Sequence, residues 1–212
     1  MNLEDLLVRG SENLGIPLDT RKIQKFLSYS DLIKKWNNKI NLTSVTDYKE
    51  IVVKHFLDSL TVSEFITDGQ NILDIGTGAG FPGIPIAIVS ESLHITVLDS
   101  REKKIFFINE VLRELGLRNV KTVSGRAEDC NNGLSRNNFD FVLTRAVGDI
   151  DEVLSLSSPY IKDNGKIILM RGKEGKLEWE NYENKNYKLE NLKELKLPGT
   201  DFMRVLLVLS QK

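Results

Sequence analysis

Residues 71–83 read NILDIGTGAGFPG, a short apolar run followed by a loop with glycine at every second position. The first five residues suit a buried parallel strand, and residues 84–89 have the length and apolarity of a short helix. Gly76, Gly78 and Gly80 allow positive φ and leave no Cβ between the main chain and a bound molecule. A strand, a glycine loop and a helix in this order are typical of the nucleotide-binding corner of a Rossmann-like sheet. We therefore predict that this loop binds a ligand and is more than a tight turn.

Two ligands compete for this loop, a dinucleotide and S-adenosylmethionine. Residues 78–83 formally match the G-x-G-x-x-G pattern of dinucleotide enzymes, which alone is a weak signal. Pro82 and Pro85 fall in the expected first helical turn, where they remove N–H donors that a diphosphate would need. Asp74 would bring a carboxylate near that diphosphate, whereas it suits a ligand with ammonium and sulfonium groups. The pattern favours S-adenosylmethionine, with a nicotinamide dinucleotide as the alternative.

The rest of the chain divides into two regions that we expect to form one structural domain. Residues 1–66 predict a helical extension, with helices over 3–14, 19–40 and 50–65, the second capped by Asp19. Residues 67–212 alternate strands and helices and predict a Rossmann-like α/β core with a mostly parallel sheet. The expected strands are 71–75, 94–98, 120–124, 139–143 and 166–170, with a turn at 162–165 and a helix over 150–160. A closing antiparallel pair is expected at 188–197 and 202–209.

Several polar residues follow the expected strands at their carboxyl edge. Asp99 ends the second strand about 20 residues past the glycine loop, where an acidic side chain can accept hydrogen bonds from ribose hydroxyls. Ser100 is placed to cap the next helix. Main-chain groups of Ala127 and Glu128 are candidates for the adenine edge, with an ordinary surface charge as the alternative for Glu128. Arg145 follows the fourth strand to the same edge.

Composition sets limits on partners and location. The net charge of the 212 residues is −1, so a nucleic-acid partner would need a local basic patch. The N-terminus lacks a basic-then-apolar signal, and no apolar run is long enough to cross a bilayer, so we expect a cytoplasmic protein without a membrane partner. Two histidines and the single Cys130 predict no metal site. Nothing requires more than a monomer.

Two features of the helical extension have an ordinary and a functional reading. The lysines of the second helix fall mostly off its apolar stripe, which indicates a solvated face, with RNA contact as the alternative. His55 alone is more often a satisfied, partly buried histidine than a catalyst.

Taken together, the motifs resemble the RsmG (GidB, glucose-inhibited division protein B) family, bacterial methyltransferases that act on guanine N7 in small-subunit ribosomal RNA. The resemblance spans residues 3–209 and rests on NLT at 41–43, HFLDS at 55–59, DIGTGAGFPGIP at 74–85, RAE at 126–128 and TRA at 144–146. The GFPGIP segment is far more specific than a generic glycine loop.

The resemblance implies a class I methyltransferase fold, S-adenosylmethionine as cofactor, and small-subunit ribosomal RNA or a subunit particle as substrate. The cofactor residues that it implies, together with those expected above, are Gly76, Gly78, Gly80, Phe81, Asp99, Ala127, Glu128 and Arg145. Candidate RNA contacts are Asn41, His55, Arg171, Lys173 and Arg204. The family often has Lys-Gly where this chain has Arg171-Gly172, which keeps the charge but replaces a point charge by a planar fork.

The expected chemistry needs no general base. Guanine N7 has a lone pair and no proton, so the rate depends mainly on orientation and exclusion of water. Arg145 is the candidate for positioning, by stacking on the guanine or by a hydrogen bond to its O6. Residues 144–147 read TRAV, whereas amino-group methyltransferases usually have an Asp/Asn-Pro-Pro-aromatic motif after the fourth strand. A pyrimidine C5-methyltransferase needs a nucleophilic cysteine after the fourth strand, but Cys130 follows the third strand. An NAD-dependent oxidoreductase and a non-catalytic nucleotide- or RNA-binding module remain the alternatives.

Overall fold

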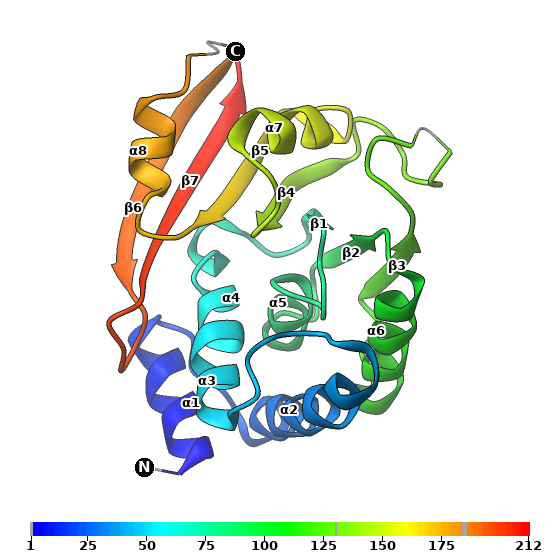
Figure 1. The fold of residues 1–212 in the computed structure, drawn as a ribbon, viewed down its shortest axis with the longest axis vertical. Helices are drawn as coiled ribbons and strands as arrows, with labels where there is room; N and C mark the ends of the chain where they lie inside the picture. The colour runs from blue at the N-terminus through cyan, green and yellow to red at the C-terminus, as the bar shows by residue number, and fades with distance from the viewer. Residues whose placement is uncertain (1, 130, 184–185) are drawn as a thin grey trace.

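A seven-stranded sheet with the order β3-β2-β1-β4-β5-β7-β6 runs through the computed structural model, which describes residues 2–129, 131–183 and 186–212 (Figure 1). Cys130 lies outside the described residues. The strands are β1 Asn71–Ile75, β2 His94–Asp99, β3 Val120–Ser124, β4 Phe139–Arg145, β5 Ile161–Arg171, β6 Tyr187–Lys196 and β7 Met203–Gln211. Neighbours among β1 to β5 pair in parallel, and β7 is antiparallel to both β5 and β6. The predicted mostly parallel α/β sheet with an antiparallel closing pair is confirmed.

Helices precede the sheet and connect its strands. The N-terminal segments are α1 Leu3–Asn13, α2 Thr20–Ile40, α3 Tyr48–Ile51, a π-helical turn η1 Val52–Leu57, α4 Asp58–Leu60 and a 3₁₀ turn η2 Ser63–Phe65. Those of the core are α5 Gly83–Val89, α6 Glu102–Leu115, α7 Ile150–Ser157 and α8 Gly175–Glu180. Asp19 caps α2 as predicted, accepting a hydrogen bond of 2.8 Å from the Lys22 N–H.

Strand alternation divides the apolar side chains between two clusters, one on each face of the sheet. In β1, Ile72 joins the cluster that contains α5, α6 and the N-terminal helices, whereas Leu73 and Ile75 join the cluster under α7. Figure 1 shows the N-terminal helices below the sheet in this view, beside α5 and α6. The helical extension therefore shares one apolar core with the α5 and α6 layer. Its description as an extension of a single domain stays a prediction.

Three local predictions are wrong. Ser100 does not cap α6, because the N-cap position is Arg101, and no side chain caps this helix. Residues 162–165 do not form a free turn but lie within β5, where the pairing with β4 shifts register between Phe139 and Phe141. α7 ends at Ser157 instead of near 160, because Pro159 has no N–H to continue the helical hydrogen bonds, although its neighbour Ser158 still has right-handed helical geometry.

The glycine loop is packed so closely at Gly80 that a Cβ atom there would overlap its neighbours. A Cβ on Gly80, whose φ is +101°, would lie 2.6 Å from both Ile84 Cγ1 and Tyr29 Oη. We expect Gly80→Ala to lower the free energy of unfolding by about 2–4 kcal/mol, through steric overlap added to backbone strain. Gly199→Ala is the matched control, since its φ is also positive but nothing lies within 4 Å. It should cost about 1 kcal/mol. Denaturant unfolding measures both, and equal costs would show that the loop tolerates a side chain.

Candidate cofactor and substrate site

The glycine loop between β1 and α5 has a geometry that only glycine fits. Gly76, Gly78 and Gly80 have φ values of +70°, +64° and +101°. A Cβ on Gly76 would also lie 2.7 Å from Val147 Cγ2. The Val147 side chain, from the segment after β4, therefore packs directly on the backbone of Gly76 at the carboxyl edge of the sheet.

Asp74 closes this loop from behind, which corrects the expectation that its carboxylate faces the ligand. Its Oδ2 accepts hydrogen bonds from Thr77 Oγ1 at 2.6 Å and from the Gly83 N–H at 2.8 Å. The side chain is fully buried, and burial raises its pKa to about 6 against the opposing effect of those two hydrogen bonds. Strand alternation explains the difference, since Asp74 points to the face that α5 covers.

The start of α5 offers no free donor for a diphosphate. Pro82 and Pro85 lack an N–H, the Gly83 N–H donates to Asp74, and the Ile84 N–H donates to the Gly80 carbonyl at 2.8 Å. A dinucleotide diphosphate depends on free N–H groups at this place. The geometry therefore argues against the nicotinamide alternative.

A pocket of about 400 Å³ opens at the carboxyl edge, where β1, β2 and β4 end and residues 125–128 follow β3. It brings together four of the predicted cofactor residues, Gly76, Asp99, Ala127 and Glu128. Arg101, Lys104 and Val147 also line it. Gly78 and Gly80 belong to the loop, whereas Phe81 and Arg145 do not line this pocket and belong to a neighbouring cluster.

Asp99 links the pocket to the glycine loop. Its Oδ2 accepts a hydrogen bond of 2.9 Å from the Gly78 N–H, and its Oδ1 accepts one of 2.9 Å from the Arg101 N–H. Lys104 Nζ lies 3.5 Å from Oδ2. Because a carboxylate can accept about four hydrogen bonds, capacity remains for ribose hydroxyls. The sequence reading missed Lys104, although its place in the first turn of the helix after Asp99 could have indicated it.

The adenine side of the pocket has main-chain donors without a partner. The Ala127 carbonyl already accepts a hydrogen bond from Tyr160 Oη, which fixes this turn. Within the described residues, the N–H groups of Ala127 and Glu128 donate to no protein acceptor. The residues present thus fit S-adenosylmethionine, with Asp99 for its ribose and two free N–H groups for its adenine edge.

Arg145, Asp58 and Arg204 form a buried ionic cluster beside this pocket. Its Nη1 donates to Asp58 Oδ2 at 3.0 Å and to the Lys54 carbonyl at 3.1 Å. Arg204 binds the same carboxylate through Nε at 2.5 Å and Nη2 at 2.6 Å. Asp58 is fully buried and neutralises only one of the two guanidinium groups, so the cluster keeps one positive charge.

His55 lies between Arg145 and Phe81. Arg145 Nη2 lies 2.7 Å from His55 Nδ1, and Thr43 Oγ1 lies 2.8 Å from Nε2. Nδ1 also lies 3.1 Å from the Lys54 carbonyl oxygen, which can only accept. Because the guanidinium can only donate and its contact is the shorter one, we assign Nδ1 as its acceptor and the proton to Nε2. Burial, followed by the charge of Arg145, lowers the His55 pKa to about 3. A neutral imidazole therefore stacks on Phe81, with ring centroids 4.5 Å apart.

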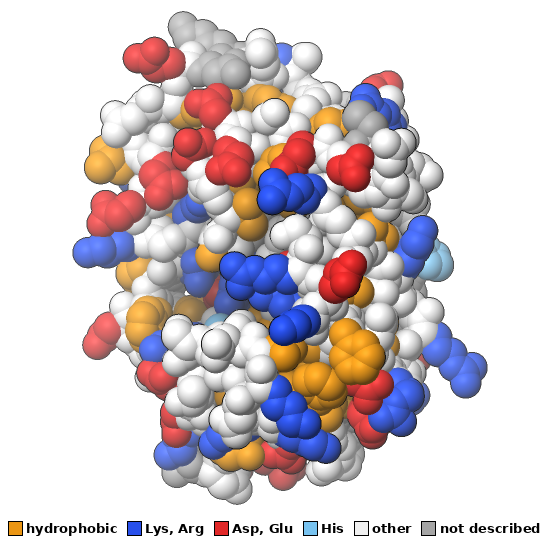
Figure 2. All heavy atoms as spheres, turned by 45° about the vertical axis from the view of Figure 1, so that its right-hand side comes forward, with side chains coloured by type: hydrophobic (Ala, Val, Ile, Leu, Met, Phe, Trp, Pro, Cys, Tyr) orange, Lys and Arg blue, Asp and Glu red, His pale blue; other side chains and the backbone are white. Residues whose placement is uncertain are grey.

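The remaining predicted RNA residues lie in different surroundings. Asn41 is the exposed, left-handed C-cap of α2, and Lys173 is exposed beside Glu174. Arg171 is mostly buried and donates to the carbonyls of Val147 and Gly148 at 3.1 and 2.8 Å, so it supports the segment that lines the pocket. The RNA contacts of all five residues stay predictions. Figure 2 shows Lys and Arg side chains gathered across the middle of one face, around a hollow.

Comparison with solved structures shows which proteins share the fold. A SAM-dependent methyltransferase from Aquifex aeolicus superposes with a TM-score of 0.61 at 18% identity, covering 85% of this chain and 97% of that one. A predicted O-methyltransferase from Agrobacterium tumefaciens gives 0.60 at 17% identity, covering 74% and 79%. This likeness shows that the chain has the fold of these methyltransferases, a mostly parallel α/β sheet with helices on both faces.

Sequence comparison defines the family. The profile of "rRNA small subunit methyltransferase G" (GidB) matches residues 22–204. Ribosomal RNA small subunit methyltransferase G of Clostridium perfringens (strain 13) is 39% identical, over all of this chain and 91% of the relative. The protein of that name from Thermoanaerobacter pseudethanolicus is also 39% identical, over 98% and 89%. The chain belongs to the rRNA small subunit methyltransferase G (GidB) family.

The described part of the chain contains neither a candidate membrane span nor a candidate metal cluster. None of its helices has the length and apolarity to cross a bilayer. Across the same residues, no three His, Cys, Asp or Glu side chains are grouped so that they could hold a metal ion.

The lowered pKa of His55 predicts a pH dependence of stability. The unfolded chain takes up a proton below about pH 6.5, the folded chain only near pH 3, so stability falls as the pH drops through this window. The loss attributable to His55 approaches about 1.4 kcal/mol per pH unit. We expect the free energy of unfolding to fall further between pH 7 and pH 5 in the unmodified protein than in His55→Asn.

Both proteins contain Asp74, whose raised pKa acts in the opposite direction over the same range, and its effect cancels in the difference between them. Denaturant unfolding at several pH values provides the measurement. Parallel curves for the two proteins would mean that His55 is accessible to protons in the folded state.

Proposed function

We propose that this chain transfers a methyl group from S-adenosylmethionine to N7 of a guanine in 16S ribosomal RNA. The observation that carries the proposal is the pocket in which the glycine loop and Asp99 meet, in a chain of the GidB family. We further propose that it acts in the cytoplasm, as a monomer and without a metal. The relatives named above carry small-subunit ribosomal RNA in their names, which supports this substrate class.

The protein's part in the reaction is to position and to exclude water. When bound, the sulfonium donor supplies an electrophilic methyl carbon, and its carbon–sulfur electron pair leaves with sulfur. Guanine N7 contributes its lone pair and loses no proton, so no side chain must act as a base. His55 agrees with this, because a neutral imidazole with a pKa of about 3 is a poor proton acceptor at neutral pH.

Arg145 is the residue that we propose to orient the target base. Its guanidinium lies 5.3 Å from the centre of the Phe81 ring, and the two following residues, Ala146 and Val147, line the donor pocket. The excess positive charge of the Arg145–Asp58–Arg204 cluster favours the O6 acceptor of guanine, which leaves the lone pair of the neighbouring N7 for the methyl carbon. Arg145 would then lie beside both the acceptor base and the donor pocket, without separating them.

The function is tested by methyl transfer from radiolabelled S-adenosylmethionine to naked 16S rRNA and to small-subunit particles, followed by mapping of the modified base. We expect one 7-methylguanosine on at least one of these substrates. Label at another base atom would refute N7 specificity. Donor binding without transfer to either substrate would favour a non-catalytic binding module, and nicotinamide cofactor binding would favour an oxidoreductase.

The role of Arg145 predicts a separable defect. Arg145→Ala should lower kcat for methyl transfer about 100-fold, as expected for the loss of an oriented charged donor. The donor Kd should change much less, since Arg145 lies outside the pocket of Gly76 and Asp99. Arg118→Ala, an exposed change of equal charge, should leave both values unaltered. Circular dichroism establishes that each variant is folded. Unchanged kcat in a folded Arg145→Ala protein would reduce Arg145 to a structural residue.

A further inference from the structure

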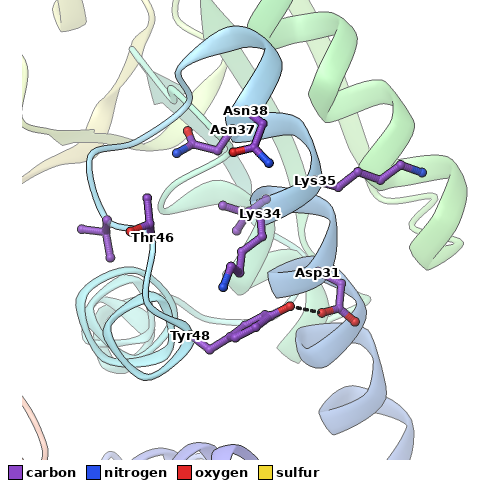
Figure 3. A pocket seen from close by; sticks show the side chains of 9 residues that line it. Asp31, Lys34, Lys35, Asn37, Asn38, Thr46 and Tyr48 are labelled. Atoms are coloured by element: carbon purple, nitrogen blue, oxygen red, sulfur yellow. Dashed lines mark hydrogen bonds between the residues drawn. The ribbon is translucent and has the colours of Figure 1, made fainter.

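A second pocket, of about 420 Å³, lies between the C-terminal half of α2 and the segment that leads into α3 (Figure 3). The lining residues that carry the argument are Asp31, Lys34, Asn37, Asn38, Thr46 and Tyr48. The methyl-donor pocket is lined by other residues, so this is a separate site.

Lys34 places a cation in this pocket. Its Nζ lies 3.9 Å above the centre of the Tyr48 ring, and Tyr48 Oη donates to Asp31 Oδ1 at 2.8 Å. Figure 3 shows Lys34 directed toward the Tyr48 side of the pocket. Among the residues that the structure describes, no carboxylate lies within 4.0 Å of Lys34 Nζ. The ammonium group is thus held in place by a ring and remains available to an anion.

Uncharged polar groups accompany this cation. The exposed side chains of Asn38 and Thr46 have no hydrogen-bond partner within the described chain. An amide and a hydroxyl beside a lysine suit the sugar hydroxyl, base edge and phosphate of a nucleotide. A simple anion without a sugar or base would contact the lysine but would leave the amide and the hydroxyl without a partner.

The second pocket is joined to the Arg145 cluster by hydrogen bonds. Asn37 Nδ2 donates to the Thr43 carbonyl at 2.9 Å, and Asn37 Oδ1 accepts from the Thr43 N–H at 2.9 Å. Thr43 Oγ1 in turn contacts His55 Nε2 at 2.8 Å, and His55 contacts Arg145. One loop therefore forms a wall of the second pocket and holds the histidine beside Arg145.

We propose that this pocket binds one nucleotide of the RNA substrate outside the methylated guanine, with Lys34 on its phosphodiester. The inference rests on the proposed function and adds a second point of attachment for the same strand. RNA is favoured over an acidic protein segment because the pocket offers hydrogen-bonding groups for a sugar and base in addition to charge. A second attachment point fixes the strand's register relative to Arg145 without taking part in the reaction.

Steady-state methyl transfer by Lys34→Gln tests the proposal on both naked 16S rRNA and small-subunit particles. We expect KM for RNA to rise about tenfold, the effect of losing one charged contact. The donor Kd and kcat should stay within about twofold, because the lost contact stabilises bound RNA equally in the ground state and in the transition state. The slope of log affinity against log salt should become shallower by about 0.7–0.9.

Lys22→Gln is the matched control, since Lys22 lies on the same helix about 18 Å from Lys34 along its axis and its side chain has no partner within the described residues. It should leave KM and the salt slope unaltered. Thr46→Ala removes a pocket hydroxyl without touching Lys34, should raise KM about threefold, and serves if Lys34→Gln fails to fold.

Four results separate the possibilities. An unchanged KM and salt slope for both pocket variants, with methyl transfer intact, would overturn the proposal and leave the proposed function standing. A KM effect on particles but not on naked RNA would overturn it in favour of a ribosomal protein contact. Equal effects of Lys22→Gln and Lys34→Gln would overturn it in favour of diffuse charge. Absence of transfer by the unmodified protein would instead refute the proposed function.

Discussion

Two buried carboxylates hold the backbone between β1 and α5 in the one shape that leaves room for a ligand. Asp74 binds the Gly83 N–H behind the loop, and Asp99 binds the Gly78 N–H at its front. Between them the chain takes positive φ three times, at positions where no side chain would fit or be relaxed. The pocket at the carboxyl edge exists because this segment cannot fill the space itself. Everything proposed about the donor depends on that constraint.

The ionic cluster and the donor pocket meet at residues 145–147. Arg145 belongs to the ionic cluster of Asp58 and Arg204, whereas Ala146 and Val147 line the donor pocket. Arg171 supports this segment by binding the carbonyls of Val147 and Gly148. A displacement of Arg145 would therefore also displace the wall of the donor pocket, and a displacement of that wall would move Arg145. The N-terminal helices contribute to the same junction, since they supply His55 and Asp58.

Local patterns were enough to predict the glycine loop, the parallel sheet and the position of Asp99, because each follows from strand period, loop composition and spacing. The direction of Asp74 was misread, although strand alternation with Ile72 already pointed it toward α5. The pairing of Asp58 with Arg204 joins residues 146 positions apart, and no local pattern contains that information. Lys34 and Tyr48 likewise come together only through the fold of the segment after α2. The turn predicted at 162–165 falls within the bounds of β5, but none of these four residues pairs with β4, because the register passes from Phe139–Ile161 to Phe141–Lys166 across an irregularity.

The pocket at the front of the glycine loop, beside Asp99, binds a sulfonium nucleoside. Isothermal titration calorimetry of the folded protein with S-adenosylmethionine, and separately with S-adenosylhomocysteine, tests it most directly. We expect saturable binding of both compounds at one site per chain, weakened by at least tenfold in Asp99→Ala because a charged acceptor for the ribose is lost. No saturable heat with either compound, from protein shown to be folded, would contradict it.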